Sequence, residues 1–164
     1  NWIVRRSHPE VGFHSLEVTL PWLVSAVAGV NSAGLCALLA AIPNSDPGSA
    51  PPSLLLVQEC LQRFASLDGA RDWCLERPAS GDLTLLLADA TGAQGRIEFR
   101  GRERLFSKSC DSAEPKTLGE HPSPESLAPP GAPPPQAWLR LDAAKRQLRI
   151  ESVGAKRESI LLEL

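Results

Sequence analysis

The stretch Gly29-Val30-Asn31-Ser32-Ala33-Gly34-Leu35 decides the fold, because it joins two apolar runs through a tight turn. Asn and Gly tolerate positive φ, so Asn31-Ser32-Ala33-Gly34 predicts a turn between strands at Trp22–Val30 and Leu35–Ile42. Neither run alternates with polar residues, so we expect both arms of this hairpin to be buried on both faces. Such a hairpin indicates a layered protein with a sheet in its middle.

Length and charge limit the function classes. The chain has 164 residues, enough for a sizeable core, and we expect one domain over residues 1–164. Its net charge is −2, from 17 Lys and Arg against 19 Asp and Glu, which leaves no electrostatic footprint for nucleic acid. No apolar run approaches the ~18 residues of a membrane-spanning helix. The sequence therefore predicts neither a nucleic-acid nor a membrane partner.

The cysteines do not suggest a metal site, because no CxxC spacing occurs and no His lies beside a Cys at ligand spacing. Cys36, Cys60 and Cys74 fall within apolar patterns, where a free Cys packs as a small hydrophobe. We expect reduced thiols, which favours a cytoplasmic location. Neither a metal nor any other cofactor is indicated.

Helical periodicity appears twice after the hairpin. The first expected helix, Leu54–Ala65, begins at an N-cap, Ser53, and the second, opened by Ser66, spans Leu67–Glu76. In the first helix the expected buried stripe is Leu54, Val57, Leu61 and Phe64, and the expected outward residues are Gln58, Glu59, Gln62 and Arg63.

Strand patterns surround these helices, whereas residues 1–14 are expected to be irregular. Ser15–Leu20 alternates and predicts a strand with one solvent-facing side. The other expected strands are Asp82–Asp89, Gly95–Arg100, Glu103–Ser107, Ala137–Asp142, Gln147–Val153 and an edge strand at Ser159–Leu164. Asp111–Gln136 holds eight prolines and few bulky apolar residues, which predicts a surface loop or linker at residues 111–136.

Several motifs, taken in order, resemble one enzyme family. They are Asn1-Trp2, the Gly29–Leu35 turn, the helix pair within Pro52–Arg77, the strand and turn Leu85–Gly92 followed by Glu98, and the closing hairpin Ala144–Ile150. This order is similar to the acyl-coenzyme A:6-aminopenicillanic-acid (isopenicillin N) acyltransferase family, a peptidase-like branch of the N-terminal nucleophile hydrolases. The family carries the turn as Gly-x-Asn-x-x-Gly-Leu.

The resemblance implies an α+β fold in four layers, an αββα sandwich, either complete or incomplete in this chain. It also implies cleavage or transfer of an amide-linked acyl group of a small molecule. In that family a Cys becomes the first residue by self-cleavage; its thiol attacks the carbonyl and its own α-amine serves as the base. The resemblance places Asn1 and Trp2 next to this nucleophile, as candidate substrate-binding residues.

The chain departs from the family pattern in three places. Asn1 has no nucleophilic group, so a catalytic Cys would have to lie in an upstream segment. The second hairpin arm is apolar from Leu38 to Ala41, where the family carries a polar Asn. The proline-rich run stands where the family has a Thr-Asn-His stretch. Two hypotheses remain open: an amide hydrolase or acyltransferase whose nucleophile is not in this chain, and a non-catalytic binding or regulatory module.

Because the chain starts at Asn1 and contains no Met, it is expected to be a processed product, a fragment, or a sequence lacking its first residues. Other site candidates have structural explanations. Asn31 is expected to be a turn residue, and Asp89 and Glu98 are better explained as a turn cap and an exposed strand residue than as a carboxylate pair.

A thiol–imidazole pair between Cys36 and His8 or His14 is not supported by their spacing. The remaining histidine, His121, lies in the proline-rich run and is expected to be solvated.

Overall fold

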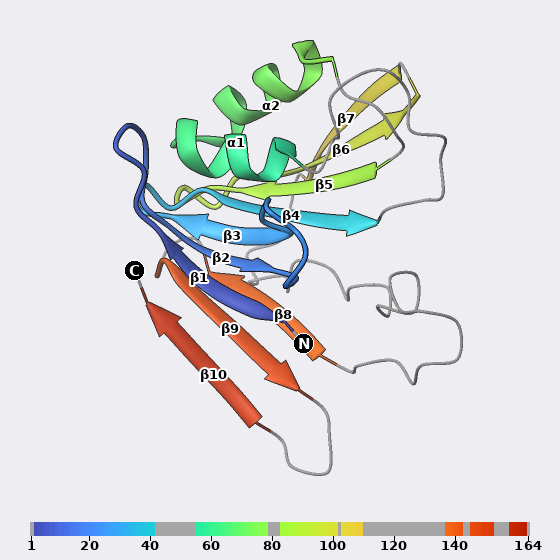
Figure 1. Cartoon of the computed structure of the whole chain (residues 1–164). Helices are drawn as coiled ribbons and strands as arrows, with labels where there is room; N and C mark the ends of the chain where they lie inside the picture. The colour runs from blue at the N-terminus through green and yellow to red at the C-terminus, as the bar shows by residue number, and fades with distance from the viewer. Residues whose placement is uncertain are drawn as a thin grey trace, which may run out of the picture.

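The computed structural model describes residues 2–41, 55–78, 83–101, 103–109, 137–142, 145–152 and 158–163. These residues form a seven-stranded sheet, a three-stranded sheet and two helices (Figure 1). The larger sheet consists of β1 (Ile3–Ser7), β2 (Ser15–Thr19), β3 (Ala28–Asn31), β4 (Cys36–Ala41), β5 (Leu83–Ala88), β6 (Gln94–Arg100) and β7 (Glu103–Ser109). The smaller sheet consists of β8 (Ala137–Asp142), β9 (Gln147–Ser152) and β10 (Glu158–Glu163), and the helices are α1 (Leu55–Arg63) and α2 (Leu67–Glu76).

The larger sheet is an antiparallel meander in the order β1-β2-β3-β4-β5-β6-β7, so each strand pairs with its neighbours along the chain. The expected β3–β4 hairpin is confirmed, with Val30 opposite Cys36. The smaller sheet has the order β10-β9-β8, which confirms the closing hairpin and the C-terminal edge strand.

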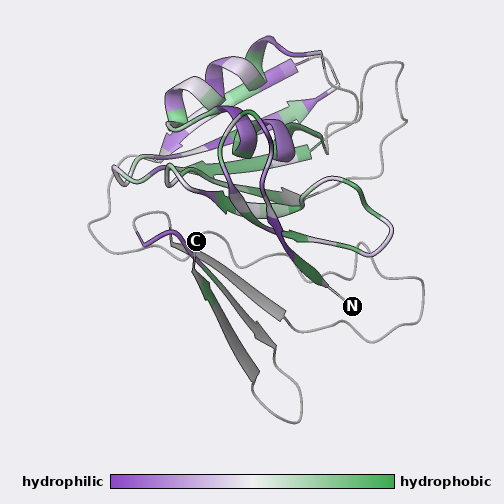
Figure 2. Cartoon of the chain, turned by 60° about the vertical axis from the view of Figure 1, so that its left-hand side comes forward, coloured by the Kyte–Doolittle hydropathy of each residue, from purple (hydrophilic) through white to green (hydrophobic). Residues whose placement is uncertain are grey.

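The helices and the smaller sheet cover opposite faces of the larger sheet. Figure 1 shows α1 and α2 over one face and β8 to β10 beyond the other, and Leu148 of β9 belongs to the core on that second face. Figure 2 shows hydrophobic residues concentrated in the strands of the larger sheet and hydrophilic ones on the helices. No second helical layer occurs among the described residues, so the four-layer αββα sandwich stays a prediction.

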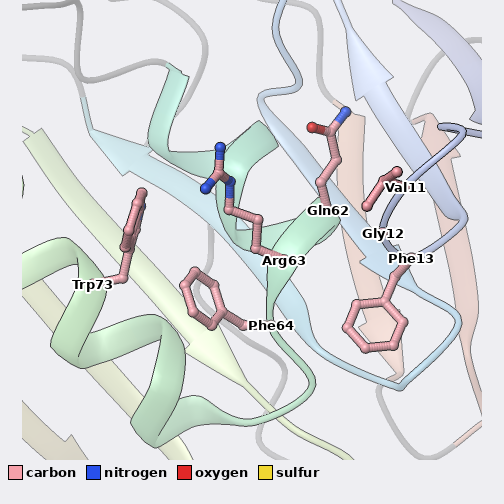
Figure 3. A pocket seen from close by; sticks show the side chains of 7 residues that line it. All are labelled: Val11, Gly12, Phe13, Gln62, Arg63, Phe64 and Trp73. Atoms are coloured by element: carbon pink, nitrogen blue, oxygen red, sulfur yellow. The ribbon is translucent and has the colours of Figure 1, made fainter.

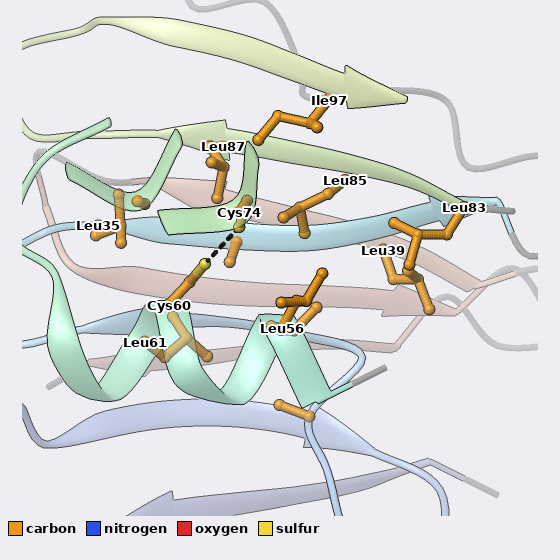
Figure 4. Close-up of a cluster of buried hydrophobic side chains, with 14 of the residues drawn as sticks. Leu35, Leu39, Leu56, Cys60, Leu61, Cys74, Leu83, Leu85, Leu87 and Ile97 are labelled. Carbon is orange, nitrogen blue, oxygen red and sulfur yellow. Dashed lines mark hydrogen bonds between the residues drawn. The ribbon is translucent and has the colours of Figure 1, made fainter. Parts of the chain in front are cut away.

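Two hydrophobic clusters fill these interfaces. The cluster beneath the helices includes Leu35, Leu39, Val57, Leu61 and Leu85, all nearly or fully buried (Figure 4). The cluster between the sheets includes Leu16, Val30, Cys36, Leu38 and Leu148. Since β4 contributes to both clusters, this arm of the hairpin is buried on both faces, as its apolar sequence predicts. Burying each large side chain stabilises the fold by about 1.5–3 kcal/mol.

The motif at Gly29–Leu35 forms the turn and also holds α1. Asn31 is fully buried, and its Nδ2 donates to the carbonyls of Leu61 and Phe64 at 2.9 and 2.7 Å. Its Oδ1 accepts from the backbone N–H groups of Ala33 and Leu35. The Asn31 side chain therefore both closes the β3–β4 turn and caps the carbonyl end of α1.

Glycine is required at the two positions of this motif for different reasons. Gly34 has φ +91°, the left-handed conformation that the turn requires. A Cβ on Gly29 would lie 2.6 Å from the carbonyl oxygen of Leu16 and 2.7 Å from Leu61 Cδ1. Gly29 thus lets α1 lie directly on the sheet.

The structure corrects three strand predictions. Ile3–Ser7 is an edge strand rather than irregular chain. Its sequence shows no apolar alternation, and Arg5 within it forms an ion pair with Glu17. β2 has no solvent-facing side, because all five of its residues are buried. The first hairpin arm is a strand only from Ala28 to Asn31, since residues 21–27 form turns and bends that bond back to Thr19. The expected burial of this arm is wrong at Trp22 and Val24, which are exposed.

The helices follow their predicted bounds closely, and α2 spans Leu67–Glu76 as expected, with Ser66 at its N-cap. The predicted faces of α1 are partly wrong. Its buried residues are Leu56, Val57, Cys60 and Leu61, whereas Phe64 is half-buried, and Gln58 points to the sheet instead of solvent. Leu54, the predicted cap at Ser53 and the proline-rich run at residues 111–136 lie outside the described residues.

Candidate functional site

The candidate site lies at the end of the larger sheet where β1 begins. Four apolar residues lie at the start of β1 or in the β2–β3 connection, and we call them the apolar rim: Trp2, Ile3, Trp22 and Val24. Ile3 pairs with Thr19 at the end of β2, which places the start of β1 beside the β2–β3 connection. Trp22 and Val24 are 71% and 85% exposed, and Ile3 is 41% exposed. Trp2 is half-buried and packs against both hydrophobic clusters.

Thr19 holds the connection that carries Trp22 and Val24. Its Oγ1 lies 2.9 Å from the carbonyl oxygen of Leu23 and 2.7 Å from that of Ser25, within hydrogen-bonding distance of both. The backbone N–H of Leu23 donates to the Leu20 carbonyl. Leu23 packs against the cluster beneath the helices while its neighbours Trp22 and Val24 face outward. Trp22 and Val24 are therefore exposed on a connection whose backbone these bonds hold in place.

A polar network centred on the buried Glu17 was not predicted from the sequence. Glu17 is fully buried; its Oε2 accepts from Arg5 Nε at 2.6 Å, and its Oε1 accepts from Ser15 Oγ and Gln58 Nε2. Gln58 Oε1 in turn accepts from Arg5 and from the backbone N–H of Ala26. These bonds join β1, β2, α1 and the β2–β3 connection. Both carboxylate oxygens of Glu17 are hydrogen-bonded and the residue has no exposed surface, so its role is to hold these elements together.

The other carboxylates singled out from the sequence also have structural partners. Asp89 Oδ2 accepts from the backbone N–H of Leu67 at 2.9 Å, which caps the start of α2, and Oδ1 accepts from Thr91. Burial acts to raise the pKa of Asp89, but the hydrogen bonds from Leu67 and Thr91 together hold that pKa below its ordinary value. Glu98 is half-buried rather than exposed as expected, because it forms ion pairs with Arg96 and Arg100. Asp89 is thus a turn and helix cap, as expected.

The Cys36 thiol is buried, whereas the imidazoles of His8 and His14 are exposed, so they do not form a pair. Cys36 is buried in β4, facing the smaller sheet. His8 and His14 are exposed and contact each other edge to face, with ring centroids 4.6 Å apart. Within the described ranges no three His, Cys, Asp or Glu side chains group as a metal site. Asn1 and His121 lie outside the described residues.

A pocket of about 620 Å³ opens elsewhere, between the β1–β2 connection and the helices (Figure 3). Its lining is Val11, Gly12, Phe13, Gln62, Arg63, Phe64 and Trp73. Figure 3 shows Phe13 on the loop side and Phe64, Arg63 and Trp73 on the helix side. The loop is held against α1, since Phe13 N donates to the Gln62 carbonyl at 2.9 Å.

The aromatic wall of this pocket is fixed by a charged side chain behind it. Trp73 Nε1 donates to Glu59 at 3.0 Å, and Arg77 also pairs with Glu59. Burial acts to raise the pKa of Glu59, but the bonds from Arg77 and Trp73 hold it below its ordinary value. The Arg63 guanidinium lies 5.0 Å from the Trp73 ring centroid. The aromatic residues gave no sequence signal of a pocket, because Phe13 lies in the β1–β2 connection, Phe64 directly after α1 and Trp73 in α2.

No family model matches the sequence, and neither does any curated protein. Among solved structures, the chain is similar to penicillin V acylase from Agrobacterium tumefaciens, at 17% identity and a TM-score of 0.62 over 99% of this chain and 77% of that one. The chain therefore shares the fold of that penicillin V acylase. Two variants of conjugated bile acid hydrolase from Clostridium perfringens match at 14% and 13% identity, with TM-scores of 0.45 over 66% of this chain and 42% of theirs. Neither helix in the described ranges is long and apolar enough to cross a membrane.

Proposed function

We propose that this chain is the larger part of an amide hydrolase or acyltransferase that acts on the amide-linked acyl group of a small molecule. The observation that carries the proposal is the fold shared with penicillin V acylase over 99% of this chain. The acyltransferase branch is favoured by the motif order, above all by the Gly29–Leu35 turn, in which Gly29, Asn31, Gly34 and Leu35 each have a packing or bonding role.

The nucleophile in this proposal comes from a segment that precedes Asn1. The thiols of Cys36, Cys60 and Cys74 are all buried, so none of them is open to a substrate. A Cys at a chain terminus supplies both the attacking thiol and, through its own amine, the base that takes the thiol proton. Such a segment would enter beside Trp2, and so next to the apolar rim.

The apolar rim has the composition expected of an acyl-binding surface. Trp22 and Val24 offer exposed apolar area on a backbone that Thr19 and Gln58 hold in place. Pre-positioned apolar side chains bind an apolar group without paying for their own ordering. We assign binding of the acyl group to the rim and, following the resemblance, contact with the amide to Asn1 and Trp2.

A non-catalytic binding module is the second candidate function. The observation in its favour is that the polar residues near the turn are already used. The Asn31 side chain makes four hydrogen bonds within the fold, Asp89 caps α2, and Leu38 and Leu39 are buried where the family has a polar residue. Such a chain would bind an acyl amide at the rim and leave it intact.

The deciding experiment compares the chain beginning at Asn1 with the same chain carrying whatever segment its coding region places upstream. Penicillin V serves as the acyl-amide probe, with binding measured by calorimetry and cleavage by release of the free amine. Cleavage by the longer chain only, abolished when an upstream Cys is replaced by Ala, supports the enzyme. Binding without cleavage by either chain supports the module.

A matched pair of variants tests the rim. Val24→Ser should weaken probe binding at least threefold, whereas Val11→Ser should not, although Val11 is 89% exposed and thus equally open to solvent. Equal effects of the two substitutions would show that the rim is not the binding surface. Absence of probe binding and of cleavage in both chains would reject the proposed function in either form.

A further inference from the structure

Two buried cysteines face each other between the helices. Cys60 of α1 and Cys74 of α2 have no exposed surface, and their Sγ atoms lie 3.4 Å apart (Figure 4). A disulfide has an S–S bond of about 2.05 Å, so the two sulfurs would approach by about 1.4 Å to form one. Rotation of two side chains within the cluster can supply a movement of that size.

We propose that Cys60 and Cys74 form a disulfide under oxidising conditions, which joins α1 to α2 across the core. The proposal does not depend on the proposed function. From their apolar surroundings alone, these two cysteines would be interpreted only as packing residues. The proposal gives them a chemical role as well.

The reaction balances with hydrogen peroxide as the oxidant. One thiol loses its proton and its sulfur attacks a peroxide oxygen; the O–O bond breaks, a sulfenic acid forms, and the departing hydroxide takes the proton to give water. The second thiol then attacks the sulfenic sulfur, the S–S bond forms, and a second water leaves. Two thiols and one peroxide thus give one disulfide and two waters, with two electrons passing from sulfur to oxygen.

The position of the pair selects these two cysteines over Cys36. Cys60 and Cys74 belong to the cluster beneath the helices, whereas Cys36 belongs to the cluster between the sheets. The larger sheet separates the two clusters, so Cys36 cannot reach either sulfur without unfolding. The structure therefore predicts one intramolecular pairing among the described cysteines.

Burial makes the reaction slow in the closed fold. The hydrogen bond with Cys74 and desolvation by burial both hold the pKa of Cys60 well above its ordinary value, so the reactive thiolate is scarce. Oxidation then proceeds through local opening of α2. A low concentration of urea should accelerate cross-linking, because it raises the population of the opened state.

The test uses the full chain, oxidised with hydrogen peroxide and unfolded in iodoacetamide so that free thiols are alkylated. The expected product carries two fewer alkyl groups than the reduced chain, and digestion should yield one peptide pair joined through Cys60 and Cys74. Dithiothreitol should reverse the change. The cross-linked chain should melt about 5–10 °C above the reduced chain, since the bond closes a short loop of the unfolded chain.

Variants at single cysteines provide the controls. Cys36→Ala should still cross-link, while Cys60→Ala and Cys74→Ala, each checked for a cooperative melt, should not. A joined peptide containing Cys36 or Cys110 in place of this pair would overturn the proposal. So would a cross-linked chain that melts below the reduced one, or full alkylation of all four cysteines after oxidation in dilute urea.

Discussion

The side-chain amide of Asn31 donates to the backbone carbonyl of Phe64, 33 positions further along the chain, at 2.7 Å. The same amide group also donates to the carbonyl of Leu61, in the last turn of α1. Carbonyls at a helix end have no partner within the helix, so a buried side chain that meets two of them fixes where the helix stops. One residue of the β3–β4 turn thus determines both the turn and the position of α1.

Asn31→Ala should lower the free energy of unfolding by about 3 kcal/mol, because it leaves two carbonyls and two turn N–H groups without their partner. Urea unfolding followed by circular dichroism measures the loss. Ser32→Ala, in the same turn, should change stability by less than about 0.5 kcal/mol. A similar small loss for Asn31→Ala would contradict the capping role.

Gly29→Ala should destabilise the protein by about 3 kcal/mol, because the new Cβ would meet the Leu16 carbonyl, a backbone atom that cannot move aside. Gly92 offers a comparison, since it has φ +87° and open space around its would-be Cβ. Gly92→Ala should therefore show only conformational strain, about 1 kcal/mol. Equal losses in the two variants, measured by thermal unfolding, would mean that α1 does not lie as closely on the sheet as described.

Leu61 tests the packing of α1 on the sheet. It is fully buried, and Leu61→Ala should cost about 3 kcal/mol through lost burial and the cavity left behind. Leu61→Asp should prevent cooperative folding, because an unpaired carboxylate would enter the cluster. Leu55, in the same helix but 43% exposed, is the control, and Leu55→Ala should cost under about 1 kcal/mol. Calorimetric melting curves distinguish these outcomes.

Asp89 should contribute to the acid sensitivity of the fold. The pKa of Asp89 lies below its ordinary value in the folded state, so its contribution is present above the unfolded pKa of about 3.9 and is lost as pH falls through the folded pKa. Asp89→Asn should cost about 1 kcal/mol at pH 7, as loss of a charged cap does, and should make stability fall less steeply below pH 4. Parallel stability curves for the two proteins between pH 5 and pH 2.5 would rule this out.

The sequence predicted those parts of the fold whose cause is local. The turn at residues 31–34 was predicted from its Asn and Gly, although of these only Gly34 adopts positive φ while Asn31 acts through its side-chain bonds, and the bounds of α2 follow from Ser66 and an unbroken helical pattern. The arms of the closing hairpin followed from alternation in the same way. In each case the residues that decide the structure are within a few positions of one another.

The parts that were wrong depend on partners far apart in the sequence. Glu17 looked like a solvent-facing residue and Gln58 like the outer face of a helix, yet they bond to each other across 41 positions. Arg5 completes the network from a segment whose sequence gave no strand pattern. Charged and amide side chains are usually exposed, so a sequence pattern predicts them on the surface. It therefore cannot predict a network in which such side chains are buried and hydrogen-bond to one another.

The strictly sequential strand order of the larger sheet has a consequence for folding kinetics. Each strand pairs with the preceding one, so β1 to β4 and β5 to β7 can each form through short-range pairing with low loop-closure entropy, whereas β4 and β5 meet only across the long connection that holds α1 and α2. Leu148 is different, because it joins a cluster built from Leu16 and Val30, near the opposite end of the chain. Its docking brings together segments that lie more than 100 positions apart in the sequence. Refolding should therefore have a fast phase that forms the meander and a slower one in which the C-terminal strands dock.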